Sequence, residues 1–287
     1  MNSLLTTIWN PSVVAFSLGS LQVRWYSLCW CIGLALAYVV VYKLYRKQQI
    51  PQEKFDPLFL YCFVGILVGA RLGHCLLYEP GYFLAHPLEM VLPMHKMADG
   101  SWKFTGYAGL ASHGGTFGLM LALWLYVRRT KVNIMRVLDN IAIATPICAC
   151  FIRLGNLMNS EIVGKFTQSD TLGFVFVQLN ETQPRYPAQL YEAIAYLVFF
   201  FVGLALYAKM KSRVGTGFYF GHCLTTIFTF RFLVEFLKEV QEPWELHMQQ
   251  LIGLNQGQLL SIPFILIGIY CMAQGKWCKQ LGEVKEK

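Results

Sequence analysis

The stretch FIRLGNLMNSEIVGK, residues 151–165, ends a long apolar run with several polar side chains. An apolar run of about 20 residues is long enough to cross the hydrocarbon core of a bilayer. This stretch therefore predicts a membrane helix that ends in a polar site. The polar residues are a cation, two amides and a carboxylate, with a glycine after them: Arg153, Asn156, Asn159, Glu161 and Gly164.

The composition of the whole chain also favours a membrane protein. Of the 287 residues, 55% are hydrophobic and 14% are charged, whereas soluble domains carry about 25% charged residues. Residues 1–23 hold no Lys, Arg, Asp or Glu, so we expect no secretory signal peptide there, because its first region is basic. We predict an all-α polytopic membrane protein built as one membrane-embedded domain over residues 1–287.

Seven segments are apolar and long enough to span a bilayer. The two longest segments between them are 79–106 and 156–187, and within the second the alternation in TLGFVFVQLNETQPRYP (171–187) predicts a strand or hairpin in a small loop domain. The seven predicted spans are 23–43, 57–78, 107–127, 134–155, 188–208, 216–237 and 257–274.

The Lys and Arg residues between these spans predict the orientation of the chain. Fifteen follow the first, third, fifth and seventh spans, and five lie on the other side. Cytoplasmic loops carry the excess of Lys and Arg, so we expect an extracytoplasmic N-terminus, a cytoplasmic C-terminus and two extracytoplasmic long loops. The net charge of +8 is then a topology signal, and no nucleic-acid partner is needed to explain it.

The four remaining cations are arginines inside the predicted spans. Each costs about 2.5–3.5 kcal/mol at the bilayer centre, so their retention indicates a function. The predicted orientation places all four, with His113, just beneath the outer surface, where arginine favours phosphate or carboxylate. We expect a site for an anionic lipid, with separate snorkelling towards headgroups as the alternative. The arginines are Arg24, Arg71, Arg153 and Arg231.

The segment RLGNLMNSEIVG resembles the signature of the bacterial prolipoprotein diacylglyceryl transferases. That signature is an arginine, then Gly-Asn, a second asparagine, a glutamate and a glycine, at the spacing seen here. The chain departs from it at Ile152, where the family has glycine, and at Leu157, where it has an aromatic residue. The matching residues are Arg153, Gly155, Asn156, Asn159, Glu161 and Gly164.

Six further segments are similar to motifs of the same family, in the same order. They are VRWYSL with Tyr26, GARLGH with Arg71, SHGGTFG with His113, YPAQLYEA with Gln189, Tyr191 and Glu192, FRFLVEFLK with Arg231 and Glu235, and GQLLSIPF. Two positions differ from the family: Tyr186 stands where histidine is common, and Lys238 where arginine is frequent.

The resemblance implies transfer of the diacylglyceryl group of phosphatidylglycerol to the thiol of the lipobox cysteine in a prolipoprotein signal peptide. A thioether forms and glycerol phosphate leaves, which is the first step of lipoprotein maturation. It also implies a multi-pass protein among the lipids of the bacterial inner membrane, with its active site towards the periplasmic leaflet. We expect no cofactor and no metal, because the other histidines show no ligand spacing and the cysteines are scattered.

The resemblance and the chemistry together assign roles to individual residues. Arg153 and Arg231 are expected to stabilise the departing phosphate, with Glu161 and Glu235 orienting them. His113 is expected to be the general base, or else a hydrogen-bonded structural histidine. Tyr26 is expected to position the lipid or His113, or to be an interfacial aromatic. The remaining residues assigned to the headgroup site are Asn156, Asn159, Gly164 and Arg71, with Gly114 and Gly115 allowing close approach of a helix or lipid.

Two other functions fit part of the pattern. A lipid-binding or lipid-moving transporter would share the arginines, but it needs a polar route towards the cytoplasm. The inner halves of the first, third, fifth and seventh predicted spans offer little polarity for such a route. An inactive paralogue would have lost the residues of the site, whereas His113, Arg153 and Arg231 are retained.

Overall fold

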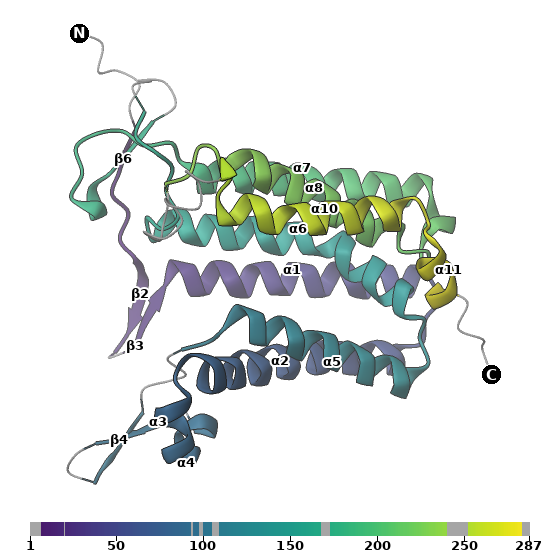
Figure 1. Ribbon diagram of the computed structural model, residues 1–287, viewed down its shortest axis with the longest axis horizontal. Coiled ribbons are helices and arrows are strands. Elements are labelled where there is room, and N and C mark those ends of the chain that lie inside the picture. Colours follow the sequence, from purple (N-terminus) through teal and green to yellow (C-terminus); the bar gives the residue numbers. More distant parts are fainter. Residues whose placement is uncertain are drawn as a thin grey trace. The chain divides into compact units, whose positions relative to one another are not determined.

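The computed structural model describes residues 7–19, 21–92, 94–97, 100–104, 109–167, 173–239 and 252–282 (Figure 1). The chain forms two compact units. Among the described residues, the first unit combines residues 7–44 with residues 135–282, and the second is Tyr45–Ile134.

Four helices in the described part of the chain are long and apolar enough to cross a membrane. They are α1 (Trp25–Lys47), α2 (Gln52–Gly73) with its π-helical continuation η1 (His74–Tyr78), α6 (Ile134–Met158) and α7 (Ala188–Lys209). A fifth candidate is the pair α10 (Gln256–Met272) and α11 (Lys276–Gly282), which is bent by 63°. The chain is thus a mostly helical protein with apolar helices suited to a membrane.

Two further helices lie in predicted spans but differ from a simple membrane helix. Helix α8 (Phe218–Val234) is apolar and has 17 residues, which gives a length of about 25 Å at 1.5 Å per residue. Helix α5 (Ser112–Thr130) begins with Ser-His-Gly-Gly and ends with Arg-Arg-Thr, which lowers its mean hydropathy. Each of the seven predicted spans therefore contains a helix, but four to five of these helices meet the criteria for a membrane span.

In the first unit, small residues allow helices α8 and α10 to pack closely. A Cβ atom on Gly268 would lie 2.8 Å from the carbonyl oxygen of Gly221, and one on Gly221 would lie 2.7 Å from the backbone nitrogen of Met272. Helix α7 contributes Ala193 and Tyr196 to an apolar cluster with Cys150 of α6. This packing places α6, α7 and α8, which carry the candidate site, in one compact unit (Figure 1).

A buried carboxylate joins the start of α6 to the turn before α8. Asp139 is fully buried and accepts hydrogen bonds from the backbone N–H groups of Gly215 at 2.8 Å, Gly217 at 3.0 Å and Phe220 at 2.9 Å. This turn follows the short 3-10 helix η3 (Lys211–Arg213). Three hydrogen bonds satisfy a charge that would otherwise be costly to bury.

Strands in the first unit connect the beginning of the chain to the predicted loop 156–187. Strand β1 (Thr7–Trp9) pairs in parallel with β6 (Phe174–Phe176), and a 3-10 turn η2 (Val177–Leu179) follows. Strands β2 (Val14–Leu18) and β3 (Leu21–Arg24) form an antiparallel pair before α1. A strand is thus present in segment 171–187, as predicted, but its ladder partner is remote in sequence.

In the second unit, α2 and α5 meet along glycines. A Cβ atom on Gly65 would lie 2.7 Å from the carbonyl oxygen of Gly118, and one on Gly69 would lie 2.7 Å from the Cα of Gly118. One on Gly73 would lie 2.7 Å from the Cα of Gly114. Glycines at these three positions of α2 let it come close enough to α5 for backbone contact.

The predicted loop 79–106 carries regular structure that the sequence did not indicate. It contains helices α3 (Pro80–Ala85) and α4 (Pro87–Val91) and the antiparallel strands β4 (Met94–Lys96) and β5 (Trp102–Phe104). The carboxylate of Glu89, 4% exposed, ties these elements together.

Three groups bind the Glu89 carboxylate. Tyr82 donates its hydroxyl to Oε2 at 2.7 Å, the His95 ring lies 2.8 Å from the same oxygen, and the Lys96 N–H donates to Oε1 at 3.2 Å. The hydroxyl of Tyr82 is the main reason that the pKa of Glu89 lies below its ordinary value. The same bond raises the pKa of Tyr82.

Candidate functional site

The last turns of α6 present Arg153 and Asn156 on one face of the helix. Nη1 of Arg153 donates to Oδ1 of Asn156 at 3.2 Å, which is a contact that a three-residue spacing allows. The chain leaves the helix after Met158 through Ser160 and Ile162, both with positive φ, at 54° and 56°. This turn brings the residues that follow back towards the end of the helix.

The turn places Glu161 against the two asparagines. Nδ2 of Asn156 donates to one carboxylate oxygen of Glu161 at 3.2 Å, and Nδ2 of Asn159 donates to the other at 3.0 Å. The side-chain amide of Gln189, on α7, donates to the backbone carbonyl of Glu161. Glu161 is exposed, and it is linked to Arg153 through Asn156 rather than by a direct ion pair.

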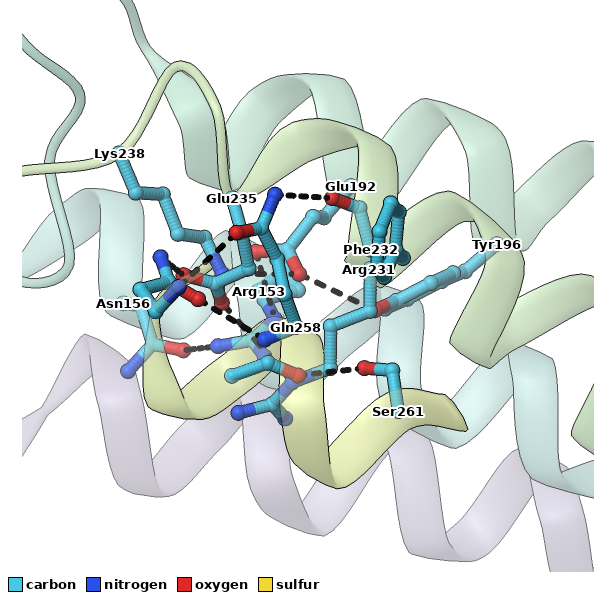
Figure 2. Close-up of polar contacts among 12 residues, drawn as sticks. Arg153, Asn156, Glu192, Tyr196, Arg231, Phe232, Glu235, Lys238, Gln258 and Ser261 are labelled. Carbon is cyan, nitrogen blue, oxygen red and sulfur yellow. Dashed lines mark hydrogen bonds and ion pairs between the residues drawn. The ribbon is translucent and has the colours of Figure 1, made fainter. Parts of the chain in front are cut away.

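Helix α7 contributes the buried partner of Arg153. Glu192 is fully buried, and its Oε2 lies 3.1 Å from Nε of Arg153. Its Oε1 accepts from the hydroxyl of Tyr196 at 3.1 Å and from Nζ of Lys238 at 3.2 Å. Figure 2 shows these side chains gathered between the helices.

The end of α8 completes the cluster. Lys238, whose side chain is 5% exposed, also donates to Oε1 of Glu235 at 3.2 Å. Glu235 lies 3.9 Å from Nε of Arg231 and accepts from Nδ2 of Asn255 at 3.1 Å. Arg231, with a side chain 38% exposed, is more open to its surroundings than Arg153 at 15%.

Gly257 leaves room for the Glu235 carboxylate. A Cβ atom on Gly257, at the start of α10, would lie 2.6 Å from the carboxyl carbon of Glu235. The start of that helix is fixed by a capping box. The side-chain oxygen of Asn255 accepts from the Gln258 N–H at 2.8 Å, and the side-chain oxygen of Gln258 accepts from the Asn255 N–H at 3.0 Å. The segment GQLLSIPF thus positions a helix terminus against the site.

Five charged side chains form what we call the charge chain: Arg153, Glu192, Lys238, Glu235 and Arg231 (Figure 2). Cations and carboxylates alternate along it. Three positive and two negative charges leave a surplus of one positive charge. Buried charges are tolerated when they are paired in this way, and the surplus suits a ligand with a single negative charge, as in a phosphodiester.

Two other predicted site residues lie near this cluster in the first unit. A Cβ atom on Gly155 of α6 would lie 3.0 Å from the ring of Tyr26, whose hydroxyl accepts from the indole N–H of Trp30 at 3.3 Å. Tyr26 therefore packs against the turn of α6 between Arg153 and Asn156. Gly164 forms a bridge to Lys238, and a Cβ atom there would lie 2.6 Å from the carbonyl oxygen of Tyr186.

Arg71 belongs to the second unit, where its guanidinium holds a loop. It is 8% exposed and donates to the carbonyl oxygens of Glu89 at 2.6 Å, Met90 at 3.2 Å and Gly109 at 3.3 Å. It also lies over the ring of Phe83, 4.8 Å from the centroid. These contacts stabilise the buried positive charge of Arg71 without a ligand.

His113 and the two glycines after it also lie in the second unit. His113 is exposed at the start of α5, and its ring makes no hydrogen bond to another described residue. Gly114 packs against Gly73 of α2, whereas Gly115 makes ordinary contacts, with its Cβ position 3.4 Å from Ala70. Gly114 thus serves close helix packing.

The prediction that four arginines share one depth in the membrane concerns residues of both units. Arg153 and Arg231 form the two ends of the charge chain in the first unit. Arg24 ends β3 in that unit, exposed and outside the ion pairs of the described residues. Arg71 lies in the second unit, so its position relative to the cluster stays a prediction.

Four residues of the cluster have no role predicted from the sequence: Glu192, Lys238, Tyr196 and Asn255. The spacing along the sequence predicts two of their contacts, because Glu192 and Tyr196 are four residues apart and Glu235 and Lys238 are three apart. The pairing of Glu192 with Arg153 joins two helices and has no such signal.

Apolar helices suited to a membrane carry a cluster of arginines and carboxylates at the ends of α6 and α8, and this combination is typical of a membrane-embedded protein with a polar site. The sequence profile of the prolipoprotein diacylglyceryl transferases matches residues 13–274, and the chain belongs to this family.

Three relatives, each named phosphatidylglycerol–prolipoprotein diacylglyceryl transferase, are similar over almost their whole length. The protein from Bacteroides fragilis is 58% identical over 273 residues, which covers 95% of this chain and 96% of the relative. That from Tolumonas auensis is 43% identical over 265 residues, covering 92% and 95%. That from Porphyromonas gingivalis is 42% identical over 273 residues, covering 91% and 92%.

Proposed function

We propose that this protein transfers the diacylglyceryl group of phosphatidylglycerol to the thiol of the lipobox cysteine of a prolipoprotein. The charge chain is the observation that carries the proposal, because it holds two arginines from different helices beside the buried Glu192 and the half-buried Glu235. The names of relatives that match the chain over nine-tenths of its length support the same reaction.

The reaction is a substitution at carbon. The thiolate sulfur bonds to the glycerol carbon of the diacylglyceryl group, and the bond from that carbon to the phosphate oxygen breaks. The electron pair leaves with glycerol phosphate, and the thiol proton passes to a base. The departing phosphate gains negative charge, so cations aimed at it stabilise the transition state more than the ground state.

We assign this stabilisation to Arg153 and Arg231. Arginine presents a planar fork of donors that matches phosphate oxygens. Asn156 and Asn159 are assigned to the headgroup, which they orient by hydrogen bonds while they hold Glu161. Gly164 permits the close approach of the loop that carries this site.

The residues of the second unit and Tyr26 are assigned supporting roles. His113 is the proposed general base for the substrate thiol, since a cysteine thiol has a pKa of about 8.5 and is mostly protonated at neutral pH. Tyr26 positions the lipid near α6. For Arg71 we propose support of the loop, because three carbonyl oxygens engage its guanidinium. Gly114 and Gly115 support the α2–α5 contact.

We also propose the topology expected from the distribution of Lys and Arg. In it the chain crosses the bacterial inner membrane seven times, with its N-terminus outside and the active site towards the periplasmic leaflet. The prolipoprotein would then meet phosphatidylglycerol in that leaflet.

The proposed function is tested by a transfer assay with purified protein, phosphatidylglycerol and a lipobox peptide. Release of glycerol phosphate and the mass of the peptide are followed for wild type, Arg153→Ala and His113→Gln. We expect the peptide to gain a diacylglyceryl group with wild type alone, because Arg153→Ala removes the cation that faces the leaving phosphate. If wild type binds the lipid but modifies no lipobox peptide, the transferase proposal fails and a transporter or inactive paralogue replaces it.

A further inference from the structure

The charge chain connects the two arginines of the proposed site through Glu192, which none of the assigned roles uses. Arg153 lies 3.1 Å from Glu192, and Glu192 accepts from Lys238 at 3.2 Å. Lys238 also donates to Glu235 at 3.2 Å, and Glu235 lies 3.9 Å from Arg231. Glu192 and Lys238 therefore connect the contacts that hold Arg153 to those that hold Arg231 (Figure 2).

Glu192 is enclosed on every side. It is fully buried, with Tyr196 and Lys238 on Oε1 and Arg153 on Oε2. Removing one partner of a buried ion pair leaves an uncompensated charge, so these contacts are mutually dependent. A carboxylate so enclosed cannot meet the lipid directly, and any effect on the reaction must pass through its partners, of which Arg153 is the arginine in direct contact.

Glu192 fixes one edge of the Arg153 guanidinium. Nε lies 3.1 Å from Oε2 of Glu192 on α7 in an ion pair without a hydrogen bond, and Nη1 donates to Asn156 of α6 at 3.2 Å. An ion pair with one helix and a hydrogen bond with another together restrict the direction in which the guanidinium group points.

We propose that Glu192 is a positioning residue that sets the orientation of Arg153 towards the headgroup phosphate, and that Lys238 supports it by neutralising its other oxygen. The proposal rests on the transfer function proposed above. Catalytic groups must be held within about 0.5 Å of their productive geometry. A displacement of about 1 Å can lower a rate by about 10²-fold.

The first test compares Glu192→Gln with wild type in the transfer assay. Glutamine keeps the size of the side chain and removes its charge. We expect kcat to fall by about 10²-fold, because Arg153 is no longer aimed at the developing charge. KM for phosphatidylglycerol should change by less than about 3-fold, since an interaction made mainly in the transition state affects kcat.

Asp139→Asn is the matched control. Asp139 is also a fully buried carboxylate of the first unit, held by backbone N–H groups, and it lies about 21 Å along α6 from Arg153 at 1.5 Å per residue. We expect this variant to lower the melting temperature and to leave kcat per folded molecule unchanged. If Glu192→Gln loses no more kcat than Asp139→Asn at an equal loss of melting temperature, Glu192 is merely structural and the proposal is overturned.

The role of Lys238 is tested by combining variants. Lys238→Met alone should lower kcat, because Glu192 and Glu235 lose their common cation, while Lys238→Arg should stay within about 10-fold of wild type. Added to Glu192→Gln, Lys238→Met should cause little further loss, because residues acting as a unit are not additive. Losses that multiply would show two independent effects and overturn the supporting role.

A second readout does not depend on catalysis. In protein labelled with ¹⁵N-arginine, the Nε resonance of Arg153 is assigned by its disappearance in Arg153→Lys. We expect its proton to exchange slowly with water in wild type and in Asp139→Asn, and much faster in Glu192→Gln. Unchanged exchange in Glu192→Gln would overturn the positioning proposal even if transfer occurs. Failure of wild type to release glycerol phosphate would overturn the transfer function alone, while faster exchange in Glu192→Gln would still support positioning.

Discussion

His113 stands exposed at the first turn of α5, with no ring hydrogen bond to another described residue. A histidine buried in the fold is normally held by a hydrogen bond, whereas an exposed ring is accessible to a substrate. Its exposure leaves the ring able to accept a proton from a substrate thiol. At the scale of this residue, base and structural roles make different predictions.

We expect His113→Gln to lower the transfer rate at about pH 7 by 10²-fold or more, as for loss of a general base. At about pH 9.5 the substrate thiol, with a pKa of about 8.5, ionises without help. The rate of the variant should then return to within about 10-fold of wild type. Transfer rates at the two pH values decide the matter. Arg153→Ala is the control that high pH should not rescue, and a rate for His113→Gln that stays equally low at both pH values would favour a structural histidine.

Sequence spacing anticipated some of the contacts between residues and missed others. Arg231 and Glu235, four residues apart on one helical face, form the expected pair. Glu161, expected to orient an arginine, reaches Arg153 only through Asn156, because the chain turns at Ser160. The partner of Arg153 could not be predicted, since it depends on how α7 packs against α6.

At the scale of elements, the contact between α2 and α5 depends on the absence of side chains. Its three closest crossings all involve glycine, and backbone atoms of α5 occupy the space where Cβ atoms on α2 would lie. Backbone cannot move aside as a flexible side chain can. The helix pair is thus sensitive to a single methyl group.

We predict that Gly69→Ala destabilises the protein by about 1–3 kcal/mol, the usual cost of overpacking. Its Cβ would lie 2.7 Å from the Cα of Gly118. Gly203→Ala, on α7, is the matched control, because nothing lies within 4 Å of its Cβ position. That change should be neutral or stabilise by about 0.5–1 kcal/mol through helix propensity. Melting temperatures in detergent give the comparison, and equal values for the two variants would contradict it.

The loop that follows η1 should be sensitive to acid through Glu89. The pKa of Glu89 lies below its ordinary value of 4.5, chiefly because Tyr82 donates to the carboxylate. A group whose pKa is depressed on folding stabilises the fold above its ordinary value, and the stabilisation is lost as the pH falls through the folded value. The melting temperature of wild type should therefore drop below about pH 4.5. Tyr82→Phe should be less stable at pH 7 and lose less on acidification, and an identical loss in both proteins would argue against the contact.

The helices were predictable, and the structure of the two long segments between predicted spans largely was not. Each of the seven apolar runs contains a helix, and the ends of these helices differ from the predicted ends of the spans where the local sequence forms a turn. For example, α8 ends at Val234 and a turn follows, whereas the predicted span continued to residue 237. Helices α3 and α4 are too short to show a period, and the pairing of β1 with β6 joins segments more than 160 residues apart.

At the scale of the whole molecule, the number of membrane crossings predicted from the sequence exceeds the number of helices that meet the criteria for a span. Four to five of the described helices meet the criteria of length and apolarity, whereas the Lys and Arg pattern predicts seven crossings. The difference lies mainly in α5 and α8. Helix α8, at about 25 Å, is shorter than the hydrocarbon core of about 30 Å, but a bilayer can thin locally around a short helix.

We predict that α5 and α8 both cross the membrane. A reporter that is active only outside the cytoplasm should work when fused after Ala85 or Glu239, and fail when fused after Lys131 or Lys211. A reporter active only in the cytoplasm should give the opposite pattern. If fusions after Lys211 and Glu239 report the same side, α8 does not span and the seven-helix topology is incorrect.

The strand near the beginning of the chain has a practical consequence for protein production. Trp9 donates its indole N–H to the carbonyl of Leu157 at 2.9 Å, and its strand pairs with β6. Leu157 lies four residues after Arg153, so β1 braces the turn that carries the proposed headgroup residues. We therefore expect purification handles and fluorescent fusions placed after α11 to leave this contact undisturbed.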